Sequence, residues 1–410
     1  MRSVSFGKYQ LGKRVYIGEK TEIFRATRMD VTDIERLVAV KRLLPSLAAD
    51  ERSIGDFNEE ARIAVQLTHG AVAQVLDAGI SDGLPYLALE YVHGKDLKAI
   101  IERMREIKTL LAIPFSCYVV IKLCEGLNYV HEKKNPSGTP LGLVHQDVSM
   151  GNVLVSYDGE IKIVDFGSAT HTKKKREGPG DQLPGTYGYM SPERVQNKEV
   201  DHRSDVFCAG ICLYELLTNY RLFSDRSDFV ALQQIRDVDI APPSSANRQI
   251  SEQLERIVIK ALARNPNDRF QTALELHDSL QTFMYKSGFI YGRKEIAAAM
   301  GEIFGNELRG EYSDGGQSRL ATKPFPDDEG TGLFAFEHLE PVSVVNGFES
   351  TESIQQQAAE AGQAQPSEAL PEYQPPEGAA AEAAQAQQVA ATSEPPAVRY
   401  KATLLGIPPN

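Results

Sequence analysis

The chain has 410 residues, a formal net charge of −12 and 42% hydrophobic residues, which is enough apolar material for a packed core. Most of the negative charge lies after residue 310, in a segment with 15 acidic and 4 basic residues, so the first 310 residues are nearly neutral. Because nucleic-acid binding usually requires a basic surface, this balance gives no support to a nucleic-acid partner.

The apolar stretches and the cysteines both favour a cytoplasmic protein without a membrane span. No N-terminal run has the length of a signal peptide, and the longest apolar stretch, 206–217, is interrupted by Glu215 and is shorter than the roughly 20 residues that a membrane span needs. The cysteines lack the paired spacing of a zinc site, so we expect buried free thiols in a reducing compartment. They are Cys117, Cys124, Cys208 and Cys212.

Strand signals dominate the first 92 residues. Apolar runs at 38–40, 72–76 and 84–91 are separated by Gly, Asp and Pro, which punctuate strands. Between them, apolar residues in 57–67 recur at helical spacing among charged residues, which predicts one amphipathic helix.

From about residue 97 the spacing of apolar residues is mostly helical. The expected helices cover 113–130, 205–217, 229–235, 251–263 and 273–285. A small β-rich lobe followed by a larger helical lobe, an α+β fold, is therefore expected.

The last part of the chain divides into two segments. Residues 285–310 are predicted to be a helical extension, with an apolar stripe made by Ile296, Met300, Ile303 and Phe304. Residues 311–410 form an acidic tail rich in Ala, Gln, Glu and Pro, and this composition predicts disorder. Two apolar islands in it, 333–336 and 403–407, are either chance clusters or docking motifs for a partner.

The segment Val38-Ala39-Val40-Lys41 is an apolar strand that ends in a cation. Its amine either reaches solvent or has a task inside the protein, because lysine is rarely buried without one. Glu60 lies nineteen residues later on the amphipathic helix and could pair with Lys41, although a helix glutamate by itself is usually solvent-exposed.

Two polar turns follow, each next to a short apolar strand. His145-Gln146-Asp147 is followed by Asn152, and Asp165-Phe166-Gly167 comes after an apolar strand, with a hairpin turn at 158–159 between them. Phosphoryl transfer from ATP requires a lysine for the phosphates, oxygen ligands for magnesium and an Asp near the attacking hydroxyl. Asp147 would orient the hydroxyl, and Asn152 and Asp165 would bind the metal.

With these motifs in this order, the chain resembles the eukaryotic-like protein kinases, and among them the bacterial serine/threonine kinases, from about Tyr9 to Leu280. Ser191-Pro192-Glu193 stands in place of an Ala-Pro-Glu motif, Asp205 opens a long apolar helix, and Arg269 matches the arginine that pairs with the glutamate of that motif. The resemblance implies a bilobal domain over 9–284, with an N-lobe at 9–92 and a C-lobe at 93–284.

The resemblance also implies a set of site residues. The catalytic residues would be Asp147, Lys41, Glu60 and Thr186, and the metal ligands Asn152 and Asp165. Leu89 would be the gatekeeper and 90–92 the hinge that binds adenine. The implied ATP-binding residues are Val15, Gly18, Ile23, Ala39, Lys41, Leu89, Glu90, Val92, Asp96 and Leu154. The cofactors would be ATP and Mg²⁺, or Mn²⁺ in its place.

Three departures from the family pattern have consequences. Tyr16, Gly18 and Thr21 stand where three glycines are usual, and a stiffer loop should bind ATP more weakly. Gln146 replaces an arginine that binds an activation-loop phosphate, so we hypothesise activity without that phosphorylation. Ser149 replaces a common lysine, while Thr186 matches serine/threonine kinases.

Together these features predict a serine/threonine kinase that acts on protein substrates, with the chain itself as a candidate substrate. The alternative is a pseudokinase, a folded scaffold that binds partners, with or without nucleotide, and transfers no phosphate. The degraded glycine loop and Gln146 favour the scaffold, whereas the complete set of polar site residues favours the enzyme.

Overall fold

The structure is a computed structural model that describes residues 4–29, 35–171, 187–223, 228–238 and 240–314. All of these belong to one compact unit within Met1–Ala321. Thr186, nearly all of the predicted tail and both apolar islands lie outside the described residues.

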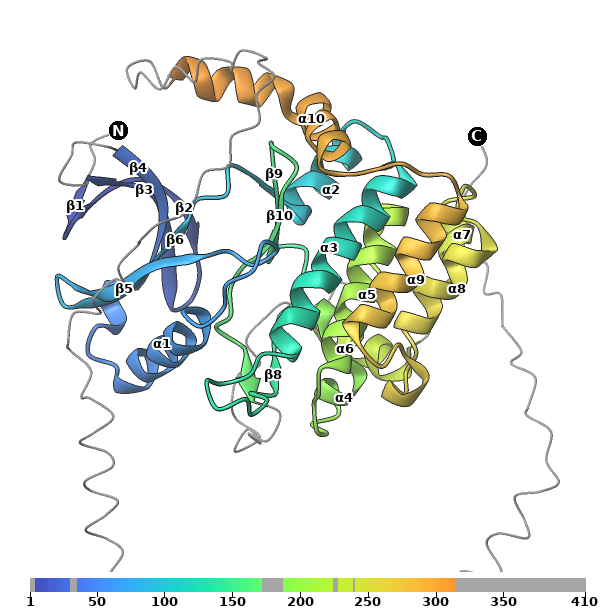
Figure 1. The fold of residues 1–410 in the computed structure, drawn as a ribbon, viewed down its shortest axis with the longest axis horizontal. Helices are drawn as coiled ribbons and strands as arrows, with labels where there is room; N and C mark the ends of the chain where they lie inside the picture. Colours follow the sequence, from blue (N-terminus) through green and yellow to red (C-terminus); the bar gives the residue numbers. More distant parts are fainter. Residues whose placement is uncertain (1–3, 30–34, 172–186, 224–227, 239, 315–410) are drawn as a thin grey trace, which may run out of the picture. The chain divides into compact units, whose positions relative to one another are not determined.

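The N-lobe is a six-stranded antiparallel sheet with the strand order β1-β2-β3-β4-β6-β5 (Figure 1). The strands are β1 (Val4–Phe6), β2 (Tyr9–Ile17), β3 (Thr21–Met29), β4 (Glu35–Leu43), β5 (Val75–Ser81) and β6 (Leu84–Glu90). Strand β1 lies before the predicted domain start at Tyr9. It nevertheless belongs to the folded lobe, because Phe6 is buried in the same apolar cluster as Tyr9 and Tyr86.

The predicted strand at 72–76 is partly wrong. Strand β5 begins only at Val75, and Val72 forms an isolated bridge to Ile163. The reason is that the preceding backbone bonds elsewhere: the Ala73 N–H donates to the Ile163 carbonyl at 2.9 Å, and the Ile163 N–H to that of Ala71 at 2.8 Å. This segment therefore ties the N-lobe to the C-lobe instead of extending the sheet.

The predicted amphipathic helix is confirmed as α1 (Glu51–Ala64), which follows the short 3₁₀ turn η1 (Pro45–Leu47). The Asp50 side chain caps α1 by accepting from the Ser53 N–H, which satisfies one of the free donors at a helix start. Phe57 packs against Leu43 of β4 and Leu87 of β6. Since α1 is held to the sheet at this point, its polar face is fixed relative to β4.

The C-lobe is mainly helical, as predicted, and its apolar helices α3, α5 and α9 lie side by side (Figure 1). Every residue of α5 after Arg203 is buried, and the four cysteines are buried free thiols, as predicted. The helices are α2 (Leu97–Glu106), α3 (Ile113–His131), α4 (Pro192–Val195), α5 (Arg203–Thr218), α6 (Asp228–Asp237), α7 (Pro243–Ala246), α8 (Glu252–Ala261) and α9 (Ala273–Lys286), with 3₁₀ turns η2 (Tyr187–Tyr189) and η3 (Pro266–Asp268).

Two small sheets carry the polar turns of the C-lobe. One has the order β10-β9-β7, with β7 (Gly94–Asp96), β9 (Val153–Ser156) and β10 (Ile161–Ile163), and the other pairs β8 (Leu143–Val144) with β11 (Thr170–His171). The predicted hairpin at 158–159 is therefore confirmed as the turn between β9 and β10, and it places the two polar turns on neighbouring backbone.

The predicted helical extension begins later and ends later than expected. The chain turns after α9, where Gly288 has a φ of +69°, and α10 then runs from Arg293 to Asp314, four residues into the segment predicted to be disordered. Ile296, Met300 and Phe304 are buried in the same cluster as the C-lobe core. The extension is thus packed onto the catalytic domain.

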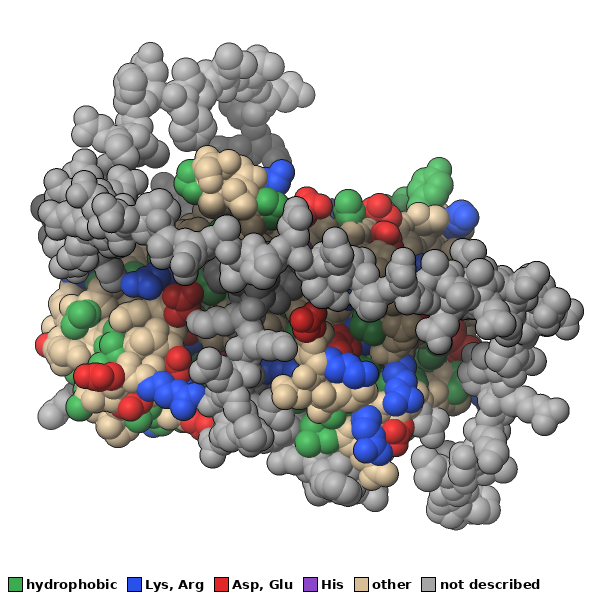
Figure 2. Space-filling model, turned by 90° about the horizontal axis from the view of Figure 1, so that it is seen from below, with side chains coloured by type: hydrophobic (Ala, Val, Ile, Leu, Met, Phe, Trp, Pro, Cys, Tyr) green, Lys and Arg blue, Asp and Glu red, His purple; other side chains and the backbone are tan. Residues whose placement is uncertain are grey.

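Figure 2 shows Lys and Arg side chains beside Asp and Glu side chains on the face that it presents. None of the helices in the described part of the chain combines the length and the apolarity that crossing a lipid bilayer requires.

Candidate active site

Three elements bring Lys41, Glu60 and Asp165 together. The Lys41 Nζ atom on β4 lies 2.6 Å from Glu60 Oε1 on α1 and 2.9 Å from Asp165 Oδ1, which follows β10. The Lys41 side chain is only 7% exposed. Of the two interpretations of this lysine, the one in which its amine reaches solvent is therefore wrong.

The protonation states of this trio follow from their burial and their mutual charges. Burial would lower the pKa of Lys41, but the carboxylates of Asp165 and Glu60 raise it above its usual value. Burial would raise the pKa of Asp165, yet Lys41 brings it below its usual value. Burial raises the pKa of Glu60, and Lys41 offsets this only in part. A charged ammonium therefore faces an ionised Asp165 at neutral pH.

Local backbone geometry aims Asp165 at Lys41. Asp165 has a φ of +64°, in the left-handed region that non-glycine residues seldom adopt. The Phe166 ring is buried next to the His145 ring, with 4.8 Å between centroids, and the Gly167 N–H donates to Asp165 Oδ1 at 3.1 Å. These contacts hold a conformation that would otherwise be costly.

Asp147 and Asn152 are joined within the loop between β8 and β9. Asn152 Nδ2 donates to the Asp147 carboxylate and to the Asp147 carbonyl, both at 2.8 Å. Burial raises the pKa of Asp147, while His145 opposes the shift. Since Nδ2 is engaged by Asp147, Oδ1 is the atom of the Asn152 amide that could coordinate a cation.

Asp205 at the start of α5 holds this loop in place. Its Oδ1 atom accepts from the Gln146 N–H at 2.9 Å, and its Oδ2 atom accepts from the His145 N–H at 2.8 Å. Oδ2 also lies 2.8 Å from His131 Nε2. The N–H groups of the two residues before Asp147 are thereby fixed while Gln146 adopts a φ of +62°. We predicted no role for Asp205 or His131, although an Asp opening an apolar helix was a usable signal.

Arg194 was not among the predicted site residues. It lies on α4, directly after Ser191-Pro192-Glu193, and its Nη1 atom donates to the Gln146 carbonyl. The backbone of Gln146, which precedes Asp147, is consequently held at its N–H by Asp205 and at its carbonyl by Arg194. No residue pattern indicated this contact, because it joins segments that are 48 residues apart.

The predicted pair of Glu193 and Arg269 is confirmed. Arg269 Nη1 lies 2.8 Å from Glu193 Oε1, and Nη2 lies 2.7 Å from Oε2, which is a two-bond pairing of guanidinium and carboxylate. The Ser204 hydroxyl also donates to Glu193. Burial would raise the pKa of Glu193, but these partners bring it below its usual value. This pair anchors α4, and with it Arg194.

The strand register shows which of the predicted ATP-binding residues lie opposite one another or on adjacent strands. Ile23 lies opposite Lys41, and Ala39 lies opposite both Arg25 and Leu89, so the three apolar side chains come from adjacent strands. In the C-lobe sheet, Leu154 lies opposite Asp96. Val15 on β2 is half exposed.

The predicted hinge, 90–92, follows β6 directly. Glu90 Oε1 accepts from the Lys162 ammonium and from the Gln74 N–H, each at 2.8 Å, so its side chain is engaged within the protein. Asp96 Oδ1 accepts from the Ala99 N–H at 2.7 Å at the start of α2, and burial raises the pKa of Asp96. Val92 is partly buried.

The degraded glycine loop is a β-hairpin turn between β2 and β3. The Gly18 N–H donates to the Thr21 carbonyl at 2.8 Å. A Cβ atom on Gly18 would lie 2.8 Å from the Tyr16 hydroxyl oxygen, so the Tyr16 ring lies over this glycine and would have to shift to admit a larger residue. Burial and the Asp165 carboxylate raise the pKa of Tyr16, and Tyr16 is 54% exposed. Weaker ATP binding remains a prediction.

The predicted metal ligands suit magnesium. Within the described ranges, no group of three His, Cys, Asp or Glu side chains could hold a metal ion by itself. Asp165 and Asn152 offer carboxylate and amide oxygens, and Mg²⁺ is usually bound by one or two such groups plus substrate phosphates and water. The lowered pKa of Asp165 keeps its carboxylate ionised. These residues therefore fit the cation.

The fold is that of a protein kinase. The protein kinase domain model matches residues 9–280, and the chain belongs to this family. It is 33% identical over 308 residues to the tyrosine-protein kinase MasK of Myxococcus xanthus, which covers 75% of this chain and 48% of MasK. It is 34% identical over 280 residues to the serine/threonine-protein kinase PknB of Mycobacterium tuberculosis, which covers 67% of this chain and 42% of PknB.

These matches confirm the resemblance to bacterial eukaryotic-like kinases, although the chain spans less than half the length of the two relatives. A crystal structure of the kinase domain of PknI from Mycobacterium tuberculosis has a TM-score of 0.51 and 22% identity, covering 69% of this chain and 98% of that domain. It shows that the fold is shared.

Proposed function

We propose that this chain is a serine/threonine protein kinase that transfers the γ-phosphate of ATP to protein hydroxyls. The observation that carries the proposal is the contact of Lys41 with both Glu60 and Asp165. That contact joins the two lobes at one buried cation, which is the arrangement that phosphate positioning requires. The kinase domain would cover 9–284, followed by the helical extension and the tail.

Each polar group would have a separate role. Glu60 holds the Lys41 ammonium in place, and Lys41 would bind ATP phosphate oxygens. Asp147, fixed by Asn152, would orient the acceptor hydroxyl and take up its proton. Asn152 and Asp165 would hold Mg²⁺, or Mn²⁺ in its place, which would neutralise phosphate charge when bound.

The adenine site would lie between the lobes. Ile23, Ala39 and Leu89 come from adjacent strands of the N-lobe sheet, and with Val15 and Leu154 they would enclose the base. The backbone at Glu90 and Val92 would bind its edge, Asp96 would bind the ribose, and Gly18 would approach the phosphates. Tyr16 beside Gly18 supports the expectation of weak nucleotide binding.

The substrates, partners and location of the chain are further parts of the proposal. We infer protein substrates, including the chain itself, and serine/threonine specificity through Thr186. The name of MasK makes phosphotyrosine the alternative to test. The apolar islands of the tail would dock partner proteins. A cytoplasmic location follows from the need for ATP.

The direct test uses Mg-ATP and a general acceptor protein, with Asp147→Asn as the control. We expect phosphoserine and phosphothreonine that depend on Asp147. Mainly phosphotyrosine would overturn the specificity. No Asp147-dependent incorporation, with nucleotide binding intact, would instead support the pseudokinase, which the complete set of polar groups does not favour.

Activity should also be independent of phosphorylation at Thr170 and Thr172. Gln146 is neutral, and its backbone N–H and carbonyl are already held by Asp205 and Arg194, so no phosphate is needed to order this backbone. We expect Thr170→Val and Thr172→Val to keep kcat within about twofold of the wild type, a change of less than 0.5 kcal/mol. Phosphatase-treated wild type is the matched control.

Loss of turnover in either variant would show that the hypothesis is wrong. Thr186 and Ser191 are less informative positions for this purpose. Thr186 is proposed to be part of the site, and Ser191 is buried with its hydroxyl 3.1 Å from that of Ser204. Substitutions there would therefore reduce activity for other reasons.

A further inference from the structure

The first turn of α10 is fixed to the turn between β9 and β10. Arg293 Nε donates to the Asp158 carbonyl at 2.8 Å, and Arg293 Nη1 lies 3.1 Å from Glu160 Oε1. Gly159 has a φ of +81°, and a Cβ atom there would collide with the Arg293 carbonyl oxygen. The glycine therefore permits the close approach of helix and turn.

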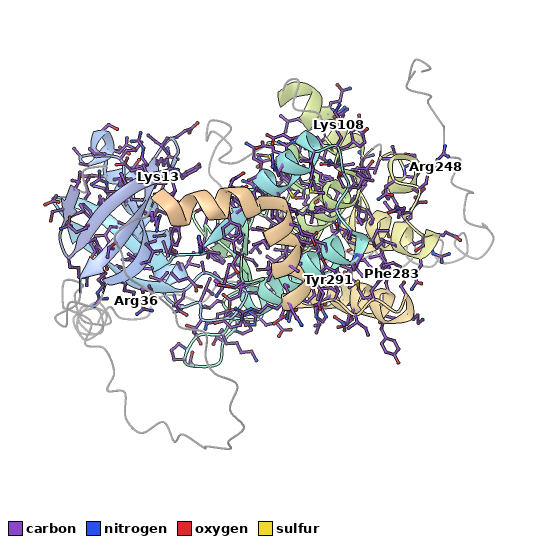
Figure 3. The ribbon with its side chains drawn as sticks, turned by 90° about the horizontal axis from the view of Figure 1, so that it is seen from above. Lys13, Arg36, Lys108, Arg248, Phe283 and Tyr291 are labelled. Atoms are coloured by element: carbon purple, nitrogen blue, oxygen red, sulfur yellow. The ribbon has the colours of Figure 1, made fainter. Side chains whose placement is uncertain are left out.

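From this anchor α10 runs toward the N-lobe, as Figure 3 shows from above, with Tyr291 beside its start. Ile296 and Met300 have no exposed surface, and Phe304 is 4% exposed. Arg103 on α2 donates to the Ile303 carbonyl at 3.4 Å. The first three turns of the helix are therefore a packed part of the domain.

A row of aromatic rings connects α10 to the predicted hinge. Tyr91 stacks on His93, with 6.4 Å between centroids, and His93 meets Tyr157 edge to face at 4.9 Å. Tyr157 in turn meets Phe304 of α10 edge to face at 6.4 Å. The Tyr157 N–H also donates to the His93 carbonyl at 2.9 Å. Edge-to-face contacts of this kind favour one ring arrangement over others.

Lys95 supplies a second connection to α10. Its Nζ atom lies 5.4 Å from the centroid of the Phe304 ring and 2.9 Å from Glu307 Oε2. Lys95 is in β7, between Gly94 and the proposed ribose ligand Asp96. A Cβ atom on Gly94 would collide with the backbone of β9, so β7 has little freedom to move alone.

We propose that α10 is a positioning element of the nucleotide site: Phe304 and Glu307 fix the segment 91–96, and through it the binding of the nucleotide. The part that concerns nucleotide rests on the proposed function, whereas the ordering of 91–96 does not. Neither residue touches the groups around Asp147, so the chemical step keeps its machinery when α10 is altered.

The experiment compares Phe304→Ala and Glu307→Lys with two control variants, Tyr285→Ala and Ile290→Ser, whose side chains are 84% and 95% exposed. Amide hydrogen exchange of 91–96 is measured in the full chain, together with the Kd for a non-hydrolysable ATP analogue with Mg²⁺. We expect faster exchange at 91–96 and a Kd raised about 3- to 10-fold in the α10 variants, with no change in the controls.

Kinetics separate positioning from general stability. The KM for ATP should rise with the Kd, while kcat at saturating ATP stays within about twofold. Lys95→Glu should raise the Kd as Glu307→Lys does, and combining the two should recover at least half of the loss, because the double variant restores the ion pair.

Unchanged exchange at 91–96 with a lower midpoint of thermal unfolding would overturn the inference, since α10 would then only stabilise the C-lobe. Should Phe304→Ala fail to fold, the inference is tested with Glu307→Lys, because Glu307 is half exposed and its substitution should leave the fold intact. If the wild type binds no nucleotide, the proposed function fails, and the exchange of 91–96 still decides whether α10 orders the hinge.

Discussion

Asp165→Asn is expected to lower kcat by about 10³-fold or more while the protein stays folded. The substitution removes the charge that would bind the metal and the partner that lies 2.9 Å from Lys41. Charge stabilisation by a metal ion in phosphoryl transfer is worth several kcal/mol, and each ~1.4 kcal/mol is tenfold in rate. Steady-state kinetics with Mg-ATP would measure the effect.

Asp158→Asn is the matched control, because Asp158 is exposed on the turn between β9 and β10, seven residues earlier. We expect it to retain wild-type kcat. A kcat for Asp165→Asn within tenfold of the wild type, with Mg²⁺ present, would contradict the assignment of Asp165 as the principal metal ligand. Removal of Mg²⁺ with a chelator should reduce the wild type to the level of Asp165→Asn.

Arg269→Met is expected to lower the free energy of unfolding by about 3–5 kcal/mol, the usual cost of removing one partner of a buried ion pair. The Glu193 carboxylate, whose side chain is 6% exposed, would lose both of its guanidinium bonds. The Ala263 and Arg203 carbonyls, which accept from Arg269 at 2.7 and 3.0 Å, would also lose a donor. Urea unfolding followed by circular dichroism would measure the loss.

Two further variants test whether the loss of stability in Arg269→Met comes from its ion pair with Glu193. Arg264→Met, at an exposed neighbouring position, should change the free energy of unfolding by less than about 0.5 kcal/mol. The double variant Arg269→Met with Glu193→Gln should recover part of the loss, because the uncompensated charge is gone. No recovery would mean that Arg269 acts mainly through the carbonyl groups.

Much of the fold could be predicted because its elements have strong local patterns. The helices α3, α5, α8 and α9 lie close to the predicted ranges, since apolar residues at helical spacing define a buried face wherever the helix packs. Short apolar runs were less informative. The run at 72–76 was predicted to be a strand, but its first residues bond to β10, and this partner determines their conformation.

The residues of the candidate site and the pair of Glu193 and Arg269 were predicted from their order along the chain, whereas the supporting roles of Asp205 and Arg194 were not. Lys41 and Asp165 are 124 residues apart, and it was the recognisable family motifs that connected them. Arg194 has no such motif, and only its position over the Gln146 carbonyl reveals its role. In the same way, an apolar stripe predicted the helix α10 but could not indicate which surface it would cover.

The sequence by itself determined the division into a β-rich and a helical lobe and the family, and it predicted the reactive groups, because periodicity and motif spacing are local properties. Only the tertiary structure decided that the Lys41 amine is buried between two carboxylates, that Asp205 and Arg194 hold the backbone of Gln146, and that α10 contacts Tyr157 and Lys95 near the predicted hinge. Those facts depend on which distant segments become neighbours, and it is these neighbours that determine burial, hydrogen bonding and charge.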